Sequence, residues 1–177
     1  MSAEGRRVAV LGVVALVLGG YVYMTTPQHS VLEGQTEDTE LPVLDFSPKQ
    51  VTQIELFFDG QRVVCQRTPE GWKRSSDEES IRTDMVDDFL MNLAKLIRIG
   101  EVVGGADKLS EYGLASPSAW VKLQMNGRGD RTLTLGKRNP VQTSLYAQVD
   151  NTPQVILVGA VVLWDMRKLL NAAANAG

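Results

Sequence analysis

The sequence predicts an α+β protein, in which a single transmembrane helix precedes a small domain of antiparallel β-hairpins with two main helices. Two observations predict this class. An uncharged apolar run fills residues 8–26, and from residue 50 onward strand-like runs flank short polar turns, with a helical pattern following each group of strands. Because strands followed by a helix occur twice, the order is consistent with a βββα-type duplication. With 44% hydrophobic and 22% charged residues, the composition is that of a globular chain.

Charge and residue counts exclude several classes of function. A formal net charge of −3 argues against a nucleic-acid partner, which usually meets a basic face. Cys65 and His29 are the only cysteine and the only histidine, so an intrachain disulfide and a His-rich metal site are excluded, together with most Ser-His-Asp or Cys-His nucleophile systems. The sequence therefore predicts no catalytic, cofactor-binding or metal-ligating residue.

The apolar run predicts an uncleaved membrane anchor. At about 1.5 Å per residue, residues 8–26 reach about 28 Å, close to the thickness of a hydrocarbon core. Arginines before the run mark residues 1–7 as a cytoplasmic tip, and tyrosines near its end suit the far interface. The anchor residues are Arg6, Arg7, Val8, Leu16, Tyr21 and Tyr23. A cleaved signal peptide is the alternative, but the run ends without an A-x-A cleavage pattern.

This orientation places the rest of the chain outside the cytoplasm, which for a bacterial inner membrane means the periplasm. Residues 27–49 contain three prolines and five acidic side chains and are predicted to be a linker, with "LPVLDF" packing near its end. His29 lies in this linker without a second His or Cys nearby, so we interpret it as a solvated side chain. The folded domain is expected to cover residues 50–172 and a flexible tail residues 173–177.

The domain begins with a hairpin, "VTQIELFF-DG-QRVVCQRT". An Asp-Gly pair favours a two-residue type I′ turn. Counting outward from it pairs Leu56 with Val63 and Ile54 with Cys65, and these four side chains should share the buried face. "PEGW" then turns the chain into a short strand around Trp72, and the acidic "SSDEES" is expected to be a hydrated loop rather than a metal site.

The first helix is predicted within residues 83–99, "TDMVDDFLMNLAKLIRI", with Thr83 as its N-cap. Its apolar residues have helical spacing and form one stripe: Val86, Phe89, Leu90, Leu93, Leu96 and Ile97.

The second half opens with "ADKLSEYGL", a short helical turn that Gly113 ends and that Pro117 prevents from resuming. A hairpin around "NGRGD" follows, in which the RGD is ordinary turn chemistry. A strand pair over residues 143–159 and a closing helix complete the domain. The residues expected to define turns are Asp59, Gly60, Tyr112, Gly113, Leu114, Pro117 and Gly136.

Five pieces of this half resemble the DUF4340 family: "EYGLASP", "WVKLQM", "LTLGK", "LYAQVD" and "QVILVG". Together with the first hairpin and its following helix, the resemblance covers residues 43–170. It implies a single-pass, membrane-anchored protein with an extracytoplasmic α+β domain, and some family members sit beside transporter components associated with gliding. The family has no established catalytic residues, so none is transferred to this chain.

These features favour a non-enzymatic accessory or scaffold subunit that docks on membrane protein subunits of a larger complex, such as a photosynthetic or respiratory assembly or a transporter. Phe57 and Val64, apolar residues opposite the expected core face, are the candidate docking surface. The alternative is a periplasmic binding module for a small ligand or glycan, linked to an ABC-transporter or gliding-type system. It would need an exposed aromatic platform, whereas each tryptophan lies in a pattern that can bury it. A hydrolase would have to use paired carboxylates, Asp87 with Asp88 or Glu111 with Asp107, and adjacent aspartates on a helix point about 100° apart.

Overall fold

The computed structural model describes residues 41–174. The predicted cytoplasmic tip, the transmembrane helix, most of the linker and the end of the tail lie outside the described residues. The predicted residues that lie outside them are Arg6, Arg7, Val8, Leu16, Tyr21, Tyr23 and His29. Within residues 41–174, no helix combines the length and the hydropathy that a membrane crossing requires.

The described domain is an α+β domain with one nine-stranded sheet and two main helices, which confirms that part of the prediction. The strands are β1 (Val51–Phe58), β2 (Gln61–Thr68), β3 (Gly71–Arg74), β4 (Ser80–Ile81), β5 (Arg98–Val102), β6 (Ala119–Met125), β7 (Arg128–Arg138), β8 (Ser144–Val149) and β9 (Val155–Gly159). The helices are α2 (Thr83–Ala94) and α3 (Val161–Ala174), with short 3-10 turns η1 (Pro48–Gln50) and η2 (Gly105–Lys108).

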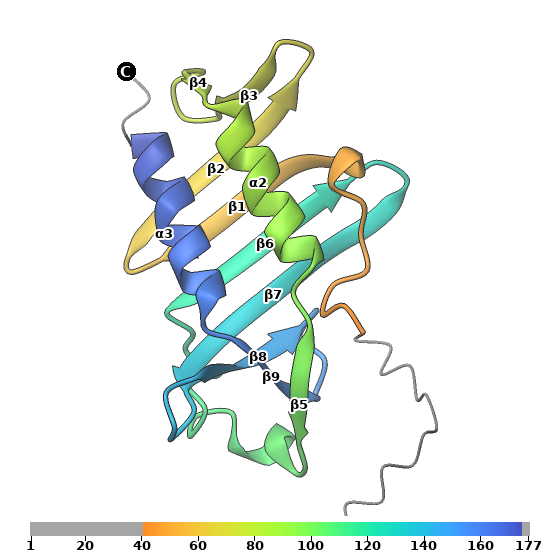
Figure 1. Ribbon diagram of the computed structural model, residues 1–177, viewed down its shortest axis with the longest axis vertical. Coiled ribbons are helices and arrows are strands. Elements are labelled where there is room, and N and C mark those ends of the chain that lie inside the picture. The colour runs from red at the N-terminus through yellow and green to blue at the C-terminus, as the bar shows by residue number, and fades with distance from the viewer. Residues whose placement is uncertain (1–40, 175–177) are drawn as a thin grey trace, which may run out of the picture. The chain divides into compact units, whose positions relative to one another are not determined.

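The sheet is antiparallel throughout, in the order β4-β3-β2-β1-β6-β7-β8-β9-β5. Apart from β5 at one edge, the order is symmetric about the β1–β6 pair, because β2 to β4 lie in sequence order on one side and β7 to β9 on the other. Both helices cross the same face of the sheet and run antiparallel to each other (Figure 1). The arrangement is compatible with a duplication, which stays a prediction.

The first hairpin has the register that its turn predicts. Leu56 pairs with Val63 and Ile54 with Cys65, and all four side chains are buried. The backbone is left-handed at both turn residues, with φ of 54° at Asp59 and 77° at Gly60, as a type I′ turn requires. These buried positions face the helices and belong to the hydrophobic core.

Helix α2 differs from its prediction at both ends. It stops at Ala94, so Leu96 and Ile97 are not helical, although Leu96 stays buried. The N–H of Val43 donates to the Leu96 carbonyl at 2.7 Å, and Pro42 forms an antiparallel bridge with Ile97. Backbone pairing with a distant segment therefore overrides the helical spacing of these two residues and leads the chain into β5, a strand that was not predicted.

The expected N-cap is also wrong. Thr83 is the first helical residue, and the N-cap position belongs to Arg82, which makes no side-chain capping bond. The Thr83 hydroxyl instead accepts a hydrogen bond from the Trp72 N–H at 3.4 Å. Thr83 thus joins the helix to β3 rather than satisfying the helix's own N–H groups.

Part of the predicted linker belongs to the folded domain. Val43, Leu44 and Phe46 are buried in the core, as the expectation for "LPVLDF" anticipated. At the other end, α3 extends to Ala174, and Ala173 is 1% exposed. The helix therefore includes the first two residues of the predicted tail.

Two expectations about turns need correction. The turn between β6 and β7 is made by Asn126 and Gly127 alone, and the RGD lies in β7, where Asp130 pairs with Lys122 at 2.8 Å. Gly136 also lies inside β7 rather than in a turn. A Cβ at Gly136 would stand 2.2 Å from the Tyr112 carbonyl oxygen, so glycine is required there by the close approach of another backbone segment.

That segment is the loop containing Tyr112, Gly113 and Leu114. Gly113 has a left-handed φ of 72°, and Pro117 follows before β6 begins, so no helix resumes. The Lys137 N–H donates to the Tyr112 carbonyl at 2.7 Å, and the Tyr112 ring lies 4.4 Å from the Tyr146 ring. The "EYGL" and "LGK" pieces are therefore the two sides of one contact.

Candidate binding site

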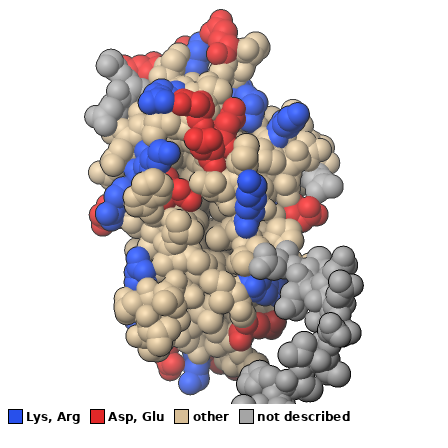
Figure 2. Space-filling model, in the orientation of Figure 1, with Lys and Arg blue, Asp and Glu red and all other residues tan. Residues whose placement is uncertain are grey.

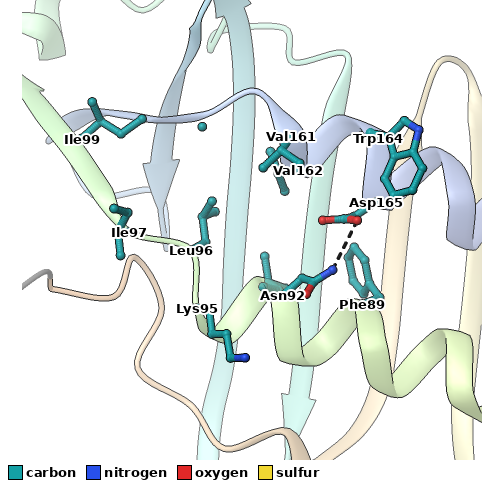
Figure 3. Close-up of a pocket in the computed structure, with 12 residues that line it drawn as sticks. Phe89, Asn92, Lys95, Leu96, Ile97, Ile99, Val161, Val162, Trp164 and Asp165 are labelled. Carbon is teal, nitrogen blue, oxygen red and sulfur yellow. Dashed lines mark hydrogen bonds between the residues drawn. The ribbon is translucent and has the colours of Figure 1, made fainter.

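A pocket of about 560 Å³ opens where the last turn of α2, the connection to β5 and the first turns of α3 meet (Figure 3). Its apolar lining comes from all three elements: Phe89 and Leu93 of α2, Leu96, Ile97 and Ile99 of the connection and β5, and Val161, Val162 and Trp164 of α3. Ligand pockets of this size and apolar character are common in proteins. Antiparallel packing of the two helices brings these ends together.

The pocket has a buried floor and an exposed rim. Phe89, Leu93 and Val162 are at most 3% exposed and belong to the core. On the rim, Ile99 is 54%, Val161 62% and Trp164 63% exposed. The surface around these helix ends is largely uncharged, whereas charged side chains gather towards the other end of the helical layer (Figure 2). Exposed apolar surface around a hollow is typical of an interaction site.

Few polar groups line the pocket. Asn92 of α2 donates from Nδ2 to Oδ1 of Asp165 at 3.4 Å, which links the two helices across its inner edge (Figure 3). Lys95 also lines the pocket, and its ammonium points away from the cavity (Figure 3). The Lys168 ammonium lies 5.7 Å from the centre of the Trp164 ring. Such a site can hold apolar groups, and it offers one carboxylate and one amide that can orient a bound group.

The predicted docking residues lie on the opposite face of the sheet. Phe57 is half-buried and stacks on Trp120, with ring centroids 5.9 Å apart and an interplanar angle of 17°. Val64 is half-buried one strand away. Glu55 and Arg62 form an ion pair on this face. The pocket and these residues are thus separate surfaces.

The carboxylate pairs considered for hydrolysis have other contacts. Asp87 accepts hydrogen bonds from Trp72 Nε1 at 3.2 Å and from Arg67 at 3.4 Å. Glu111 lies 3.7 Å from the Lys108 ammonium. In each pair, one carboxylate is therefore engaged by a neighbouring donor or ammonium group.

The acidic loop is organised by Arg74. Its guanidinium forms ion pairs with Asp77 and Glu79 and donates to the Ala173 carbonyl at the end of α3. The hydrogen bond from Arg74 lowers the pKa of Asp77. Across residues 41–174, no group of three or more His, Cys, Asp or Glu side chains is arranged to hold a metal ion.

Cys65 is fully buried, and this burial raises the pKa of its thiol to about 12 from 9.0. We expect the thiol to lower the free energy of unfolding as the pH rises from about 9 towards 12, because the unfolded thiol ionises in this range and the folded one does not. Below pH 9 this effect is absent. Urea unfolding at a series of pH values measures it, and Cys65→Ala should show a smaller alkaline decline than the parent chain. An equal alkaline loss of stability in the two chains would contradict the raised pKa of Cys65.

Sequence reasoning missed this pocket because it expected Trp164 to be buried. The expectation was wrong: the buried positions of α3 are Val162, Met166, Leu169, Leu170 and Ala173. Trp164 falls outside this spacing of three and four residues, which is a signal that the sequence contains. The other half of the pocket depends on where α2 stops, and no sequence pattern indicated that.

Fold and pocket together define an α+β domain, built on an extended antiparallel sheet, with an accessible apolar pocket in its helical layer. Residues 97–172 match the family model described as "Domain of unknown function (DUF4340)", which supports the resemblance to that family. The matched segment contains β5 to β9 and most of α3, with the pocket's exposed rim and the "EYGL"–"LGK" contact. The first hairpin and the whole of α2 lie outside the match. Neither a search of curated proteins nor a search of solved structures found a match.

Proposed function

We propose that this chain is a non-enzymatic accessory subunit, anchored in a bacterial inner membrane by residues 8–26, whose periplasmic domain docks on other subunits of a membrane protein complex. The docking site is the apolar pocket at the α2–α3 junction. Apolar side chains of a partner enter it, and burial of the rim supplies much of the binding free energy.

The single observation that carries the proposal is the exposed rim of Ile99, Val161 and Trp164 around a pocket with an apolar floor. Tryptophan is among the residues enriched at the energetic centres of interfaces. The face of Phe57 and Val64 is less suited, because its aromatic rings stack on each other and its neighbouring Glu55 and Arg62 form an ion pair.

A second candidate function is a binding module for a small apolar ligand. The volume of about 560 Å³ favours it, because many small-molecule pockets have this size. Native mass spectrometry of the purified full chain separates the two functions. A co-purifying apolar molecule that is lost when Val161 is replaced by Asp would support the ligand-binding module.

Site-specific photo-crosslinking in cells tests the docking function. With a photoreactive residue in place of Val161, we expect a crosslinked product of defined mass that contains another membrane protein subunit. Val141 is the matched control, since it is an apolar side chain that is 71% exposed, against 62% for Val161, and it lies in the β7–β8 loop. Mild-detergent extraction followed by a native gel should place the same subunit in one complex with the chain.

Two results would contradict docking through the pocket. One is a crosslinking pattern that is the same at Val141 and at Val161. The other is a chain that migrates alone on the native gel and forms no product at Val161.

A further inference from the structure

The apolar pocket continues between the helices into a narrow polar cleft. Phe89, Asn92 and Asp165 line both cavities, so the two are adjacent parts of one groove. The cleft has a volume of about 10 Å³, close to the space that one water-sized group occupies. The groove thus offers a large apolar compartment next to a small polar one.

The polar compartment has an excess of negative charge. Its charged lining consists of the carboxylates of Asp88 and Asp165 and one ammonium, that of Lys168. Within the described residues, Asp88 has no ion-pair or hydrogen-bond partner, and the one partner of Asp165 is the neutral amide of Asn92. The Lys168 ammonium is near the Trp164 ring rather than in an ion pair with either carboxylate.

From this arrangement we infer the chemistry of the partner segment: it places a lysine ammonium in the cleft, between Asp88 and Asp165, while neighbouring apolar side chains fill the pocket. The inference rests on the proposed docking function. An ammonium group matches the cleft in size and in charge, whereas a planar guanidinium is larger and an acidic side chain would be repelled. Lys168 opposes the incoming charge, so its removal should strengthen binding.

Calorimetric titration of the full chain, in phosphatidylcholine nanodiscs, tests this inference. The probes are synthetic amphipathic peptides that share one Leu-rich sequence and carry Lys, norleucine or Glu at a single central position. Titrations into empty nanodiscs are subtracted. We expect the Lys peptide to bind about tenfold more tightly than the Glu peptide, with the norleucine peptide between them, and the preference to weaken as salt is added.

Matched variants separate charge from apolar contact. Asp165→Asn and Asp88→Asn should each reduce the preference for Lys over norleucine, and Lys168→Gln should increase it. Val161→Asp, on the apolar rim, should weaken the binding of all the peptides.

A Lys peptide that binds no more tightly than the norleucine peptide would overturn the lysine inference and leave apolar docking in place. Failure of every peptide to bind, together with the absence of a crosslink at Val161, would instead remove the docking function itself. If the chain self-associates and this prevents the peptides from binding, the groove is occupied by a second copy of the chain. That result would overturn the inference as well.

Discussion

Trp72→Ala is expected to lower the free energy of unfolding by about 3–5 kcal/mol, the cost of removing a large aromatic side chain from a core. Trp72 is 1% exposed, and its Nε1 donates to Asp87 of α2. The Arg67 guanidinium lies 4.5 Å from the centre of its ring. The substitution therefore creates a cavity and also removes a link between β3 and α2. Urea unfolding of the full chain, followed by far-ultraviolet circular dichroism, measures the loss.

Trp164→Ala is the matched control, because it removes the same side chain from a position that is 63% exposed. We expect its free energy of unfolding to stay within about 0.5 kcal/mol of the parent value. Partner binding should weaken instead. If the two substitutions cost the same stability, Trp164 belongs to the core and does not form the rim of a pocket.

Gly136→Ala is expected to cost about 2 kcal/mol or more, because its Cβ would stand 2.2 Å from the Tyr112 carbonyl oxygen. Backbone atoms cannot move aside as the end of a flexible side chain can. The loop around Tyr112 would have to shift and would strain the hydrogen bond from Lys137 N–H to the Tyr112 carbonyl. Thermal and urea unfolding measure the cost, and faster proteolysis within residues 105–117 should accompany it.

Gly129→Ala serves as the control within the same strand. A Cβ at Gly129 meets nothing within 4 Å, so this substitution should leave stability nearly unchanged. An equal loss of stability in both variants would show that replacing either glycine of β7 by alanine is destabilising in itself. The close contact with Tyr112 would then not be the reason for Gly136.

The sequence predicted local structure well where neighbouring residues determine it. The Asp-Gly turn at residues 59–60 set the first hairpin's register, since an antiparallel pairing follows from its turn by counting. The three- and four-residue spacing of Val86, Phe89, Leu90 and Leu93 predicted the buried stripe of α2. Both signals depend on residues that are close together in the sequence. In the hairpin the signal is the alternation of side chains along each strand, and in α2 it is the helical period.

The sequence did not predict what distant segments decide. Leu96 and Ile97 continue the helical spacing, yet pairing with residues 41–43 takes them out of the helix. The sequence predicts a turn at Gly136, where a strand is expected to end in Leu-Gly, whereas its real constraint is a backbone that approaches from residue 112. In each case the deciding partner lies far away in the sequence.

The sequence alone therefore determined the class of the domain, its first hairpin and the apolar stripe of α2, because turn chemistry and periodicity act over a few residues. Only the tertiary structure decided where α2 stops and which residues form the pocket. Those outcomes depend on the free energy of packing α2, α3 and β5 together, and no local pattern in the chain encodes that packing.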